Sequence, residues 1–121
     1  MSTFVPLKVQ IQTGVTIVEF GQEQRQLDEL HLEKIGRQLI TLAQSASPPR
    51  LVLDMALTEF FGSSFIEILL LVWKAIESRP DGKFAISGLQ PYCREVLEVT
   101  HLDRLWPLPN TRAEAITTVN A

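Results

Sequence analysis

Two segments of the sequence decide the fold: Leu51-Val52-Leu53-Asp54-Met55 and, after a connection over residues 56–62, Ser63-Ser64-Phe65-Ile66-Glu67-Ile68-Leu69-Leu70-Leu71-Val72-Trp73-Lys74. The first segment is apolar except at Asp54, which is typical of a central parallel strand buried on both faces. The second is apolar on most of its circumference and predicts a largely covered helix. Because this helix opens on Gly62-Ser63-Ser64 just after a buried strand, we expect function at this junction.

The remaining sequence predicts a scaffold of alternating strands and helices, in the order β-β-α-β-α-β-α-(β)-α, around a mixed sheet with a parallel core. The chain opens with a predicted hairpin of a half-buried strand over 7–12 and a strand over 15–20, followed by a loop over 21–26 and an amphipathic helix that Asp28 caps and that ends near Ser45. The strand over 51–55 and the helix from Ser63 come next, then a strand over 83–87 and a helix from Pro91. An apolar turn over 101–108, with an optional edge strand, leads to a last helix capped by Thr111 and packed through Ala115, Ile116 and Val119.

Composition limits the classes of partner and site. With 121 residues, 45% hydrophobic and 21% charged, the chain is long enough to bury a core as one domain. Its net charge of −3 argues against nucleic acid or an anionic membrane as the main partner. Cys93 is the only cysteine, which excludes an intrachain disulfide and Cys-rich metal sites and fits the cytoplasm. The most apolar window, residues 65–73, is too short to span a bilayer.

Catalytic chemistry has little support in the sequence. Asp54 ends a central strand, as the phosphoryl-accepting aspartate of two-component receivers does, but the acidic pair that holds their magnesium ion is missing. We therefore expect Asp54 to hydrogen-bond the loop that follows it. A serine hydrolase needs a base near Ser63, and neither His31 nor His101 lies in a signature. Without metal-ligand spacing or a phosphate loop, we expect no catalytic residue, cofactor or metal.

The Gly62-Ser63-Ser64 junction supports a structural and a functional interpretation, and the second adds to the first. Structurally, a serine hydroxyl caps the helix and the glycine allows a tight turn. Functionally, a phosphate on a serine lies where free N–H groups and the helix dipole stabilise anions, and its roughly −1.5 to −2 charges would turn an apolar interface off. Around the junction we expect Phe60 to be mostly buried and Phe61 or Phe65 to be partly exposed.

From Leu51 to Ile116 the chain resembles the STAS domain of bacterial anti-sigma factor antagonists. The segments that carry the resemblance are Leu51-Val52-Leu53-Asp54-Met55, Gly62-Ser63-Ser64, Lys83-Phe84-Ala85-Ile86-Ser87-Gly88-Leu89, Arg94-Glu95-Val96-Leu97 and Leu102-Asp103-Arg104-Leu105-Trp106. The resemblance implies an α/β fold of the STAS type, with a mixed sheet of four to five strands and about four helices packed mainly on one face. We expect a single such domain over residues 1–121.

In that family the junction usually reads Asp-Ser-Ser/Thr-Gly, and an ATP-dependent anti-sigma kinase phosphorylates the serine after the aspartate. The unphosphorylated domain binds the kinase and frees the sigma factor, and the phosphorylated domain lets go. The resemblance implies that Ser63 is the phospho-acceptor, with Ser64 as the alternative, and that the partner binds at Phe61, Gly62, Ser63, Ser64 and Phe65. Here Gly62 replaces the aspartate of the motif, and Phe65 replaces its glycine.

Two functions therefore stay open. The first is a non-catalytic regulatory module that docks a serine-kinase-type anti-sigma factor, the partner carrying the ATP, with Ser63 as the switch. The second is a STAS scaffold that is never phosphorylated and assembles with other STAS domains or with itself, or binds a small ligand. The residues at 62 and 65 favour the second. Both describe a cytoplasmic protein without nucleic-acid or membrane contacts.

Overall fold

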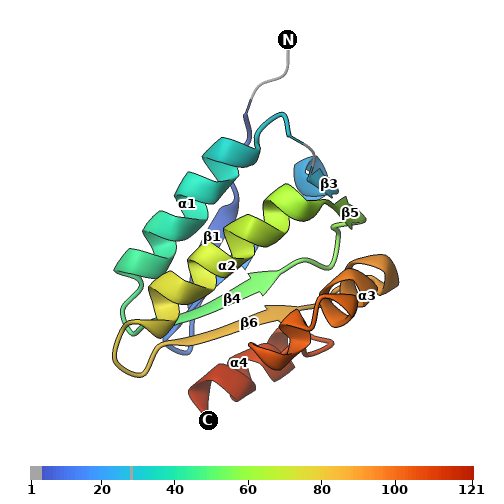
Figure 1. Cartoon of the computed structure of the whole chain (residues 1–121). Coiled ribbons are helices and arrows are strands. Elements are labelled where there is room, and N and C mark those ends of the chain that lie inside the picture. The colour runs from blue at the N-terminus through green and yellow to red at the C-terminus, as the bar shows by residue number, and fades with distance from the viewer. Residues whose placement is uncertain (1–3, 28) are drawn as a thin grey trace.

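The computed structural model describes residues 4–27 and 29–121, and within them the chain forms a four-stranded mixed sheet, β1-β2-β4-β6, and a separate two-stranded sheet, β3-β5 (Figure 1). The strands are β1 (Lys8–Gln12), β2 (Val15–Glu19), β3 (Gln26–Leu27), β4 (Arg50–Asp54), β5 (Phe60–Phe61) and β6 (Lys83–Ser87). The helices are α1 (Leu32–Ser45), α2 (Ser63–Glu77), α3 (Pro91–Val99) and α4 (Arg112–Asn120), with 3-10 turns η1 (Gln22–Gln24) and η2 (Leu102–Arg104). The α/β class and the mixed sheet are confirmed.

Strand β4 is the centre of the larger sheet. It pairs in parallel with β2 on one side and β6 on the other, and β1 adds to β2 as an antiparallel edge. Leu51, Val52 and Leu53 are fully buried, which confirms that apolar residues fill both faces of this strand. The register places Asp54 opposite Glu19 on β2 and Ser87 on β6, so the three parallel strands end together at one edge of the sheet.

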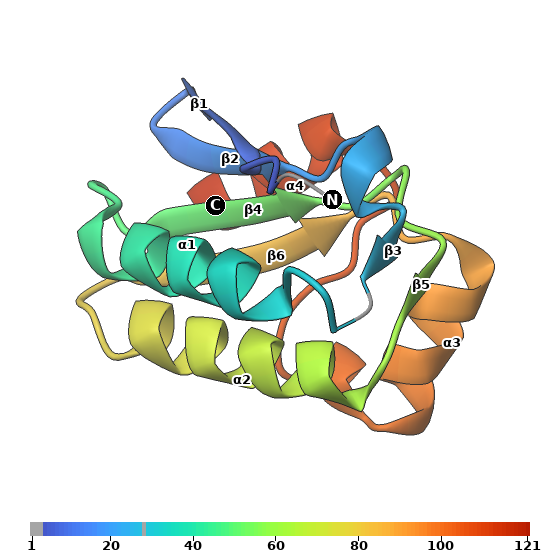
Figure 2. The same cartoon turned by 90° about the horizontal axis from the view of Figure 1, so that it is seen from above.

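The helices pack mainly on one face, as expected. Helices α1 and α2 lie side by side on that face, and α3 lies beyond the carboxyl ends of the strands, near β5 (Figure 2). Side chains from α1, α2 and α3 share the larger core with β4 and β6. Helix α4 covers the opposite face through a smaller core, in which Ala115, Ile116 and Val119 are buried as predicted.

Outside the serine junction, the structure differs from the sequence prediction in four places. Strand β1 is exposed along its whole length, with Ile11 72% exposed, because it lies beyond the helices that cover the other strands; the predicted half-burial is wrong. The predicted loop over 21–26 contains η1 and the start of β3, and the predicted turn over 101–108 contains η2 and no edge strand. Helix α1 begins at Leu32 with His31 at the N-cap position, and Asp28, the predicted cap, lies outside the described residues.

No helix in the described part of the chain is both long enough and apolar enough to cross a membrane.

Candidate functional site

The predicted junction is held in place by the short β3-β5 sheet, which sequence reasoning missed. Gln26 pairs with Phe60 and Leu27 with Phe61 in a parallel ladder. Just before it, the N–H groups of Glu59 and Phe60 both donate to the carbonyl oxygen of Arg25, at 2.7 and 3.2 Å. The buried Thr58 hydroxyl donates to the carbonyl of Gln24 at 3.3 Å. The connection between β4 and α2 is therefore fixed against the segment that precedes α1.

The ladder sets which phenylalanine faces the core, and the prediction for these rings is wrong. Phe60 is 40% exposed, whereas Phe61 and Phe65 are 1% and 0% exposed. Successive side chains of a strand point to opposite sides, so Phe61 turns inward when Phe60 turns outward. Phe65 lies one and two turns ahead of Leu69 and Val72 on the buried side of α2. Its ring contacts that of Phe61, with centroids 5.2 Å apart, so the two support the junction from below.

The serines occupy the first two positions of α2, and Gly62 is the N-cap residue. The prediction that a serine hydroxyl caps the helix is therefore wrong, because the helix begins one residue earlier than a serine cap requires. The carbonyl of Gly62 accepts from the N–H groups of Phe65 and Ile66, at 3.1 and 3.3 Å. Within the described chain, the N–H groups of Ser63 and Ser64 have no acceptor. The N-terminus of the helix, called here the mouth of α2, is therefore open to an anion.

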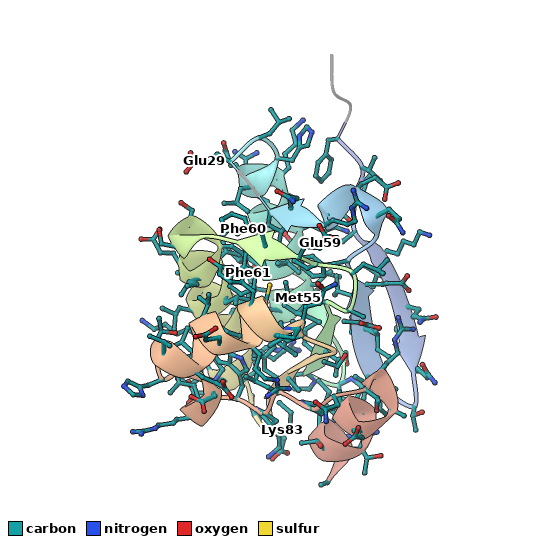
Figure 3. The ribbon with its side chains drawn as sticks, turned by 90° about the vertical axis from the view of Figure 1, so that its right-hand side faces the viewer. Glu29, Met55, Glu59, Phe60, Phe61 and Lys83 are labelled. Carbon is teal, nitrogen blue, oxygen red and sulfur yellow. The ribbon has the colours of Figure 1, made fainter. Side chains whose placement is uncertain are left out.

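The two hydroxyls differ in their surroundings. Ser63 is exposed, and its hydroxyl has no hydrogen-bond partner among residues 4–27 and 29–121. The Ser64 hydroxyl is 3.5 Å from Oε1 of Glu29, on the segment before α1. Both serines line a hollow of about 270 Å³ with Leu27, Glu29, Leu32, Phe60, Gly62 and Phe65. Figure 3 looks onto this end of the molecule, where Glu29, Glu59 and Phe60 gather around β5.

The ring of Phe60 stacks on that of Tyr92, near the start of α3, with centroids 5.8 Å apart and planes 20° from parallel. Tyr92 is 50% exposed, so both rings reach the surface beside the serines. Sequence reasoning missed Tyr92. The available signal was its place on α3 outside the inner stripe that contains Cys93 and Leu97, both of which are buried.

Asp54 is an anchor for two segments. Its Oδ1 accepts from the N–H of Ala56 at 3.2 Å, which confirms the predicted bond to the following loop. Its Oδ2 accepts from Nε of Arg112 on α4 at 2.8 Å, and Arg112 Nη2 also donates to Glu19 at 3.0 Å. Burial alone would lower the pKa of Arg112, but the hydrogen bonds and negative charges of Glu19 and Asp54 outweigh it and raise that pKa. The guanidinium thus stays charged and ties α4 to the strand ends.

Cys93 lies beneath the same connection. Its thiol is buried and within 3.7 Å of the carbonyl oxygen of Thr58, and burial raises its pKa to about 11. A thiol with so high a pKa carries little thiolate at neutral pH and is a poor nucleophile. Among the residues that the structure describes, no three His, Cys, Asp or Glu side chains come together as a metal site.

Comparison with known proteins shows which family and which solved structures the chain resembles. The model of the STAS domain family matches residues 6–115. The solved structure of an anti-sigma-factor antagonist (STAS) domain protein from Planctomyces limnophilus is 37% identical, covers 97% of this chain and 100% of its own, and superposes with a TM-score of 0.90. An anti-sigma factor antagonist from Mycobacterium paratuberculosis is 29% identical over 95% of this chain and 93% of its own, with a TM-score of 0.77.

A curated relative gives a shorter match. BtrV of Bordetella bronchiseptica, provisionally named an anti-sigma factor antagonist, is 30% identical over 66 residues, which make up 54% of this chain and 56% of that protein. The chain therefore matches a little over half the length of this relative.

Proposed function

The chain belongs to the STAS domain family, as a domain of the anti-sigma factor antagonist type, and we propose that it docks a serine-kinase-type anti-sigma factor at the mouth of α2, with Ser63 as the phospho-switch. The observation that carries this proposal is that Ser63 is exposed and its hydroxyl is unbonded within the described chain. Ser63 also lies at the first position of a 15-residue helix whose leading N–H groups are open.

The proposed modification is a phosphoryl transfer from ATP bound by the partner. The Ser63 oxygen forms a bond to the γ-phosphorus, and the bond from that phosphorus to the β,γ-bridging oxygen breaks, so ADP leaves. The hydroxyl proton passes to a base of the partner or to water. Positioning and charge stabilisation supply most of the catalysis in such transfers, and an exposed, unbonded hydroxyl meets the positioning requirement.

The phosphate would change the character of the docking surface. Before modification the mouth of α2 presents hydroxyls and the exposed face of Phe60. A phosphate adds about −1.5 to −2 charges there. The open N–H groups of α2 would stabilise it, whereas Glu29 nearby and Glu67, one turn along α2, add to the negative potential. A partner whose contact at Ser63 is apolar would have to bury this charge without a counter-charge, and it would dissociate.

The two departures from the family motif leave this surface usable. Phe65 replaces a glycine, but its ring is fully buried and lies outside a partner's path. Gly62 removes a carboxylate while keeping the N-cap position in an extended conformation, with φ −108° and ψ −169°. The burial of Phe65 thus removes the steric argument against docking and favours the regulatory module over the scaffold.

Intact-mass measurement tests the acceptor. The chain would be incubated with ATP and each ATPase-type anti-sigma factor of its organism. We expect a species heavier by about 80 Da, the mass of one phosphate, in the unmodified chain and in Ser64→Ala, and its absence in Ser63→Ala. A phosphate that persists in Ser63→Ala but disappears in Ser64→Ala would move the switch to Ser64. No added mass with any of these kinases would refute the switch.

The proposed function implies a role in transcription regulation and a cytoplasmic location. A domain that sequesters an anti-sigma factor regulates transcription by freeing the sigma factor, and both partners are then cytoplasmic proteins.

Self-assembly is the alternative function, and one observation favours it. Strand β1 pairs with β2 on one side only, and Val9 and Ile11 are 42% and 72% exposed on it. An open edge of this kind is a template for pairing with a further strand. Sedimentation of the purified chain distinguishes the two functions. A dimer that dissociates when the Ile11→Lys substitution is made would support assembly through β1.

A further inference from the structure

The surface beside Ser63 continues onto α3 through one residue. Phe60 lines the hollow that contains Ser63 and also stacks on Tyr92. Tyr92 in turn lines a second hollow of about 310 Å³ along α3, with Glu95, Val96, Val99 and Thr100. Strand β5 and α3 are direct neighbours in the fold (Figure 1). One apolar surface, defined by Phe60, Tyr92, Val96 and Val99 and called here the Phe60–Tyr92 surface, therefore begins at the phospho-acceptor.

The Phe60–Tyr92 surface lies outside the core. Phe60, Tyr92 and Val99 are 40%, 50% and 69% exposed, whereas Phe61, next in the chain, fills the interior. Exposed apolar groups that gather in one place, rather than singly, mark sites of interaction. Aromatic side chains are also the residues that most often dominate the binding energy of an interface.

Stacking makes the two rings suitable contact residues. The nearly parallel arrangement, with planes 20° apart, restrains each side chain before any partner arrives. Ordering a mobile side chain on binding costs free energy, and a restrained ring avoids part of that cost. The hydrogen bonds from the N–H groups of Glu59 and Phe60 to Arg25 fix the backbone beneath the first ring in the same way.

The charged residues around this surface indicate the charge of the partner. Glu59 precedes Phe60, and Glu95 and Glu98 lie on α3; all three are exposed. Arg94, on the same helix, donates instead to the carbonyl of Leu108 and to Asn110. Arg25 is an exposed cation on the adjoining segment, where Glu29 is also exposed, so acidic groups predominate. Complementary charge across an interface favours association, so the partner surface should be basic where it faces Glu95 and Glu98 on α3, whereas its contact at Ser63 stays apolar.

We infer that the Phe60–Tyr92 surface is the specificity-determining contact for the anti-sigma factor, and that it receives an apolar ridge flanked by Lys or Arg. This inference rests on the proposed function and extends its site from the mouth of α2 to the outer side of α3. Ser63 then controls an interface whose binding energy comes largely from the two neighbouring rings.

Affinity measurements on surface variants test the inference, with an ATPase-type anti-sigma factor that binds the unmodified chain as the probe. Phe60→Ala and Tyr92→Ala should each weaken binding about 30-fold, the effect of an interface hot spot. The double variant should lose less than the product of the two, because the rings support each other. Glu95→Gln should weaken binding mainly by lowering the association rate. Ile11→Ala, at a more exposed apolar position on β1, is the matched control and should bind normally.

Circular dichroism and thermal melting would establish that each variant is folded before its affinity is compared. If Ser63→Asp abolishes binding while Phe60→Ala and Tyr92→Ala bind like Ile11→Ala, the inference fails and the proposed function stands. If no anti-sigma factor of this type binds the unmodified chain, the proposed function fails and takes the inference with it.

Discussion

Arg112 Nε donates a 2.8 Å hydrogen bond to Asp54 Oδ2, so the end of the central strand is tied to the first residue of the last helix. The same guanidinium bonds Glu19, which lies opposite Asp54 on β2. One cation thus bridges two neighbouring carboxylates and holds α4 over its small core.

Replacing this cation should loosen α4. In Arg112→Ala the carboxylates of Glu19 and Asp54 would face each other without a counter-charge, and the free energy of unfolding should fall by about 1.5–3 kcal/mol, the range for hydrogen bonds to charged groups. Urea denaturation measures the loss, and hydrogen exchange should show faster opening of α4 amides. Arg112→Lys keeps the charge without the forked geometry, and its free energy of unfolding should lie between those of Arg112→Ala and the unmodified chain. Unchanged stability in Arg112→Ala would show that the contact is energetically neutral.

Changing the charge at Ser63 should switch binding. Ser63→Asp places a further carboxylate at the apolar contact, near Glu29, and should weaken the anti-sigma factor complex by about tenfold or more, or roughly 1.4 kcal/mol. Ser63→Ala should bind constitutively, even with ATP present. Isothermal titration calorimetry compares the two, and Ser64→Asp shows whether the effect is specific to position 63. Equal affinities for Ser63→Asp and Ser63→Ala would rule the switch out.

An aspartate at position 62 should be accepted. Apart from Gly62 and its two neighbours in the chain, no heavy atom of the described residues lies within 4 Å of where a Cβ at position 62 would be, and the N-cap backbone is extended. The new carboxylate can accept an N–H from the first turn of α2, so Gly62→Asp should raise the free energy of unfolding by a few tenths of a kcal/mol. Gly62→Ala offers no acceptor and is the matched control. Chemical denaturation that ranked the alanine variant above the aspartate variant would contradict this account.

Adjacent phenylalanines should respond very differently to truncation. Phe61 is 1% exposed, and Phe61→Ala should cost about 3–5 kcal/mol through the cavity it leaves. Phe60 is 40% exposed, and Phe60→Ala should cost less than about 1 kcal/mol. Equilibrium unfolding of both variants checks the assignment of inner and outer rings. Similar losses would mean that the two-residue ladder does not fix their directions.

The buried thiol should make stability depend on alkaline pH. The pKa of Cys93 is raised by burial from 9.0 to about 11, so the unfolded chain releases this proton at a lower pH than the folded chain does. Its contribution is therefore complete below pH 9 and is lost as pH rises to about 11. Relative to Cys93→Ala, the unmodified chain should lose up to about 3 kcal/mol over that interval. Parallel pH profiles for the two proteins would contradict the shift.

The hydrophobic pattern predicted the strands and helices in which buried side chains recur at a regular spacing. The apolar run over β4, the α1 stripe through Leu39 and the α4 contacts at Ala115, Ile116 and Val119 all lie in the core. Each of these elements offers at least five residues, enough for the spacing to distinguish a strand from a helix. The position of the serine junction could be predicted in the same way, since α2 begins where its apolar pattern begins.

The missed features depend on contacts that periodicity does not encode. Strands β3 and β5 have two residues each, too few for a pattern, and their pairing decides which way Phe60 and Phe61 point. Arg112 reaches Asp54 across 58 positions of sequence. The exposure of β1 depends on which strands the helices cover, because β6, at the other end of the strand order, is buried; the alternation of residues in β1 does not reveal this.

The empty space beside Gly62 has a consequence for how such a chain can change over generations. Glycine codons that end in a pyrimidine differ from aspartate codons at the second base alone. Because no described atom outside the adjoining residues lies within 4 Å of the new Cβ, this exchange requires no compensating change elsewhere. A lineage can therefore gain or lose a negative charge next to Ser63 in one mutational step, with the same fold before and after it.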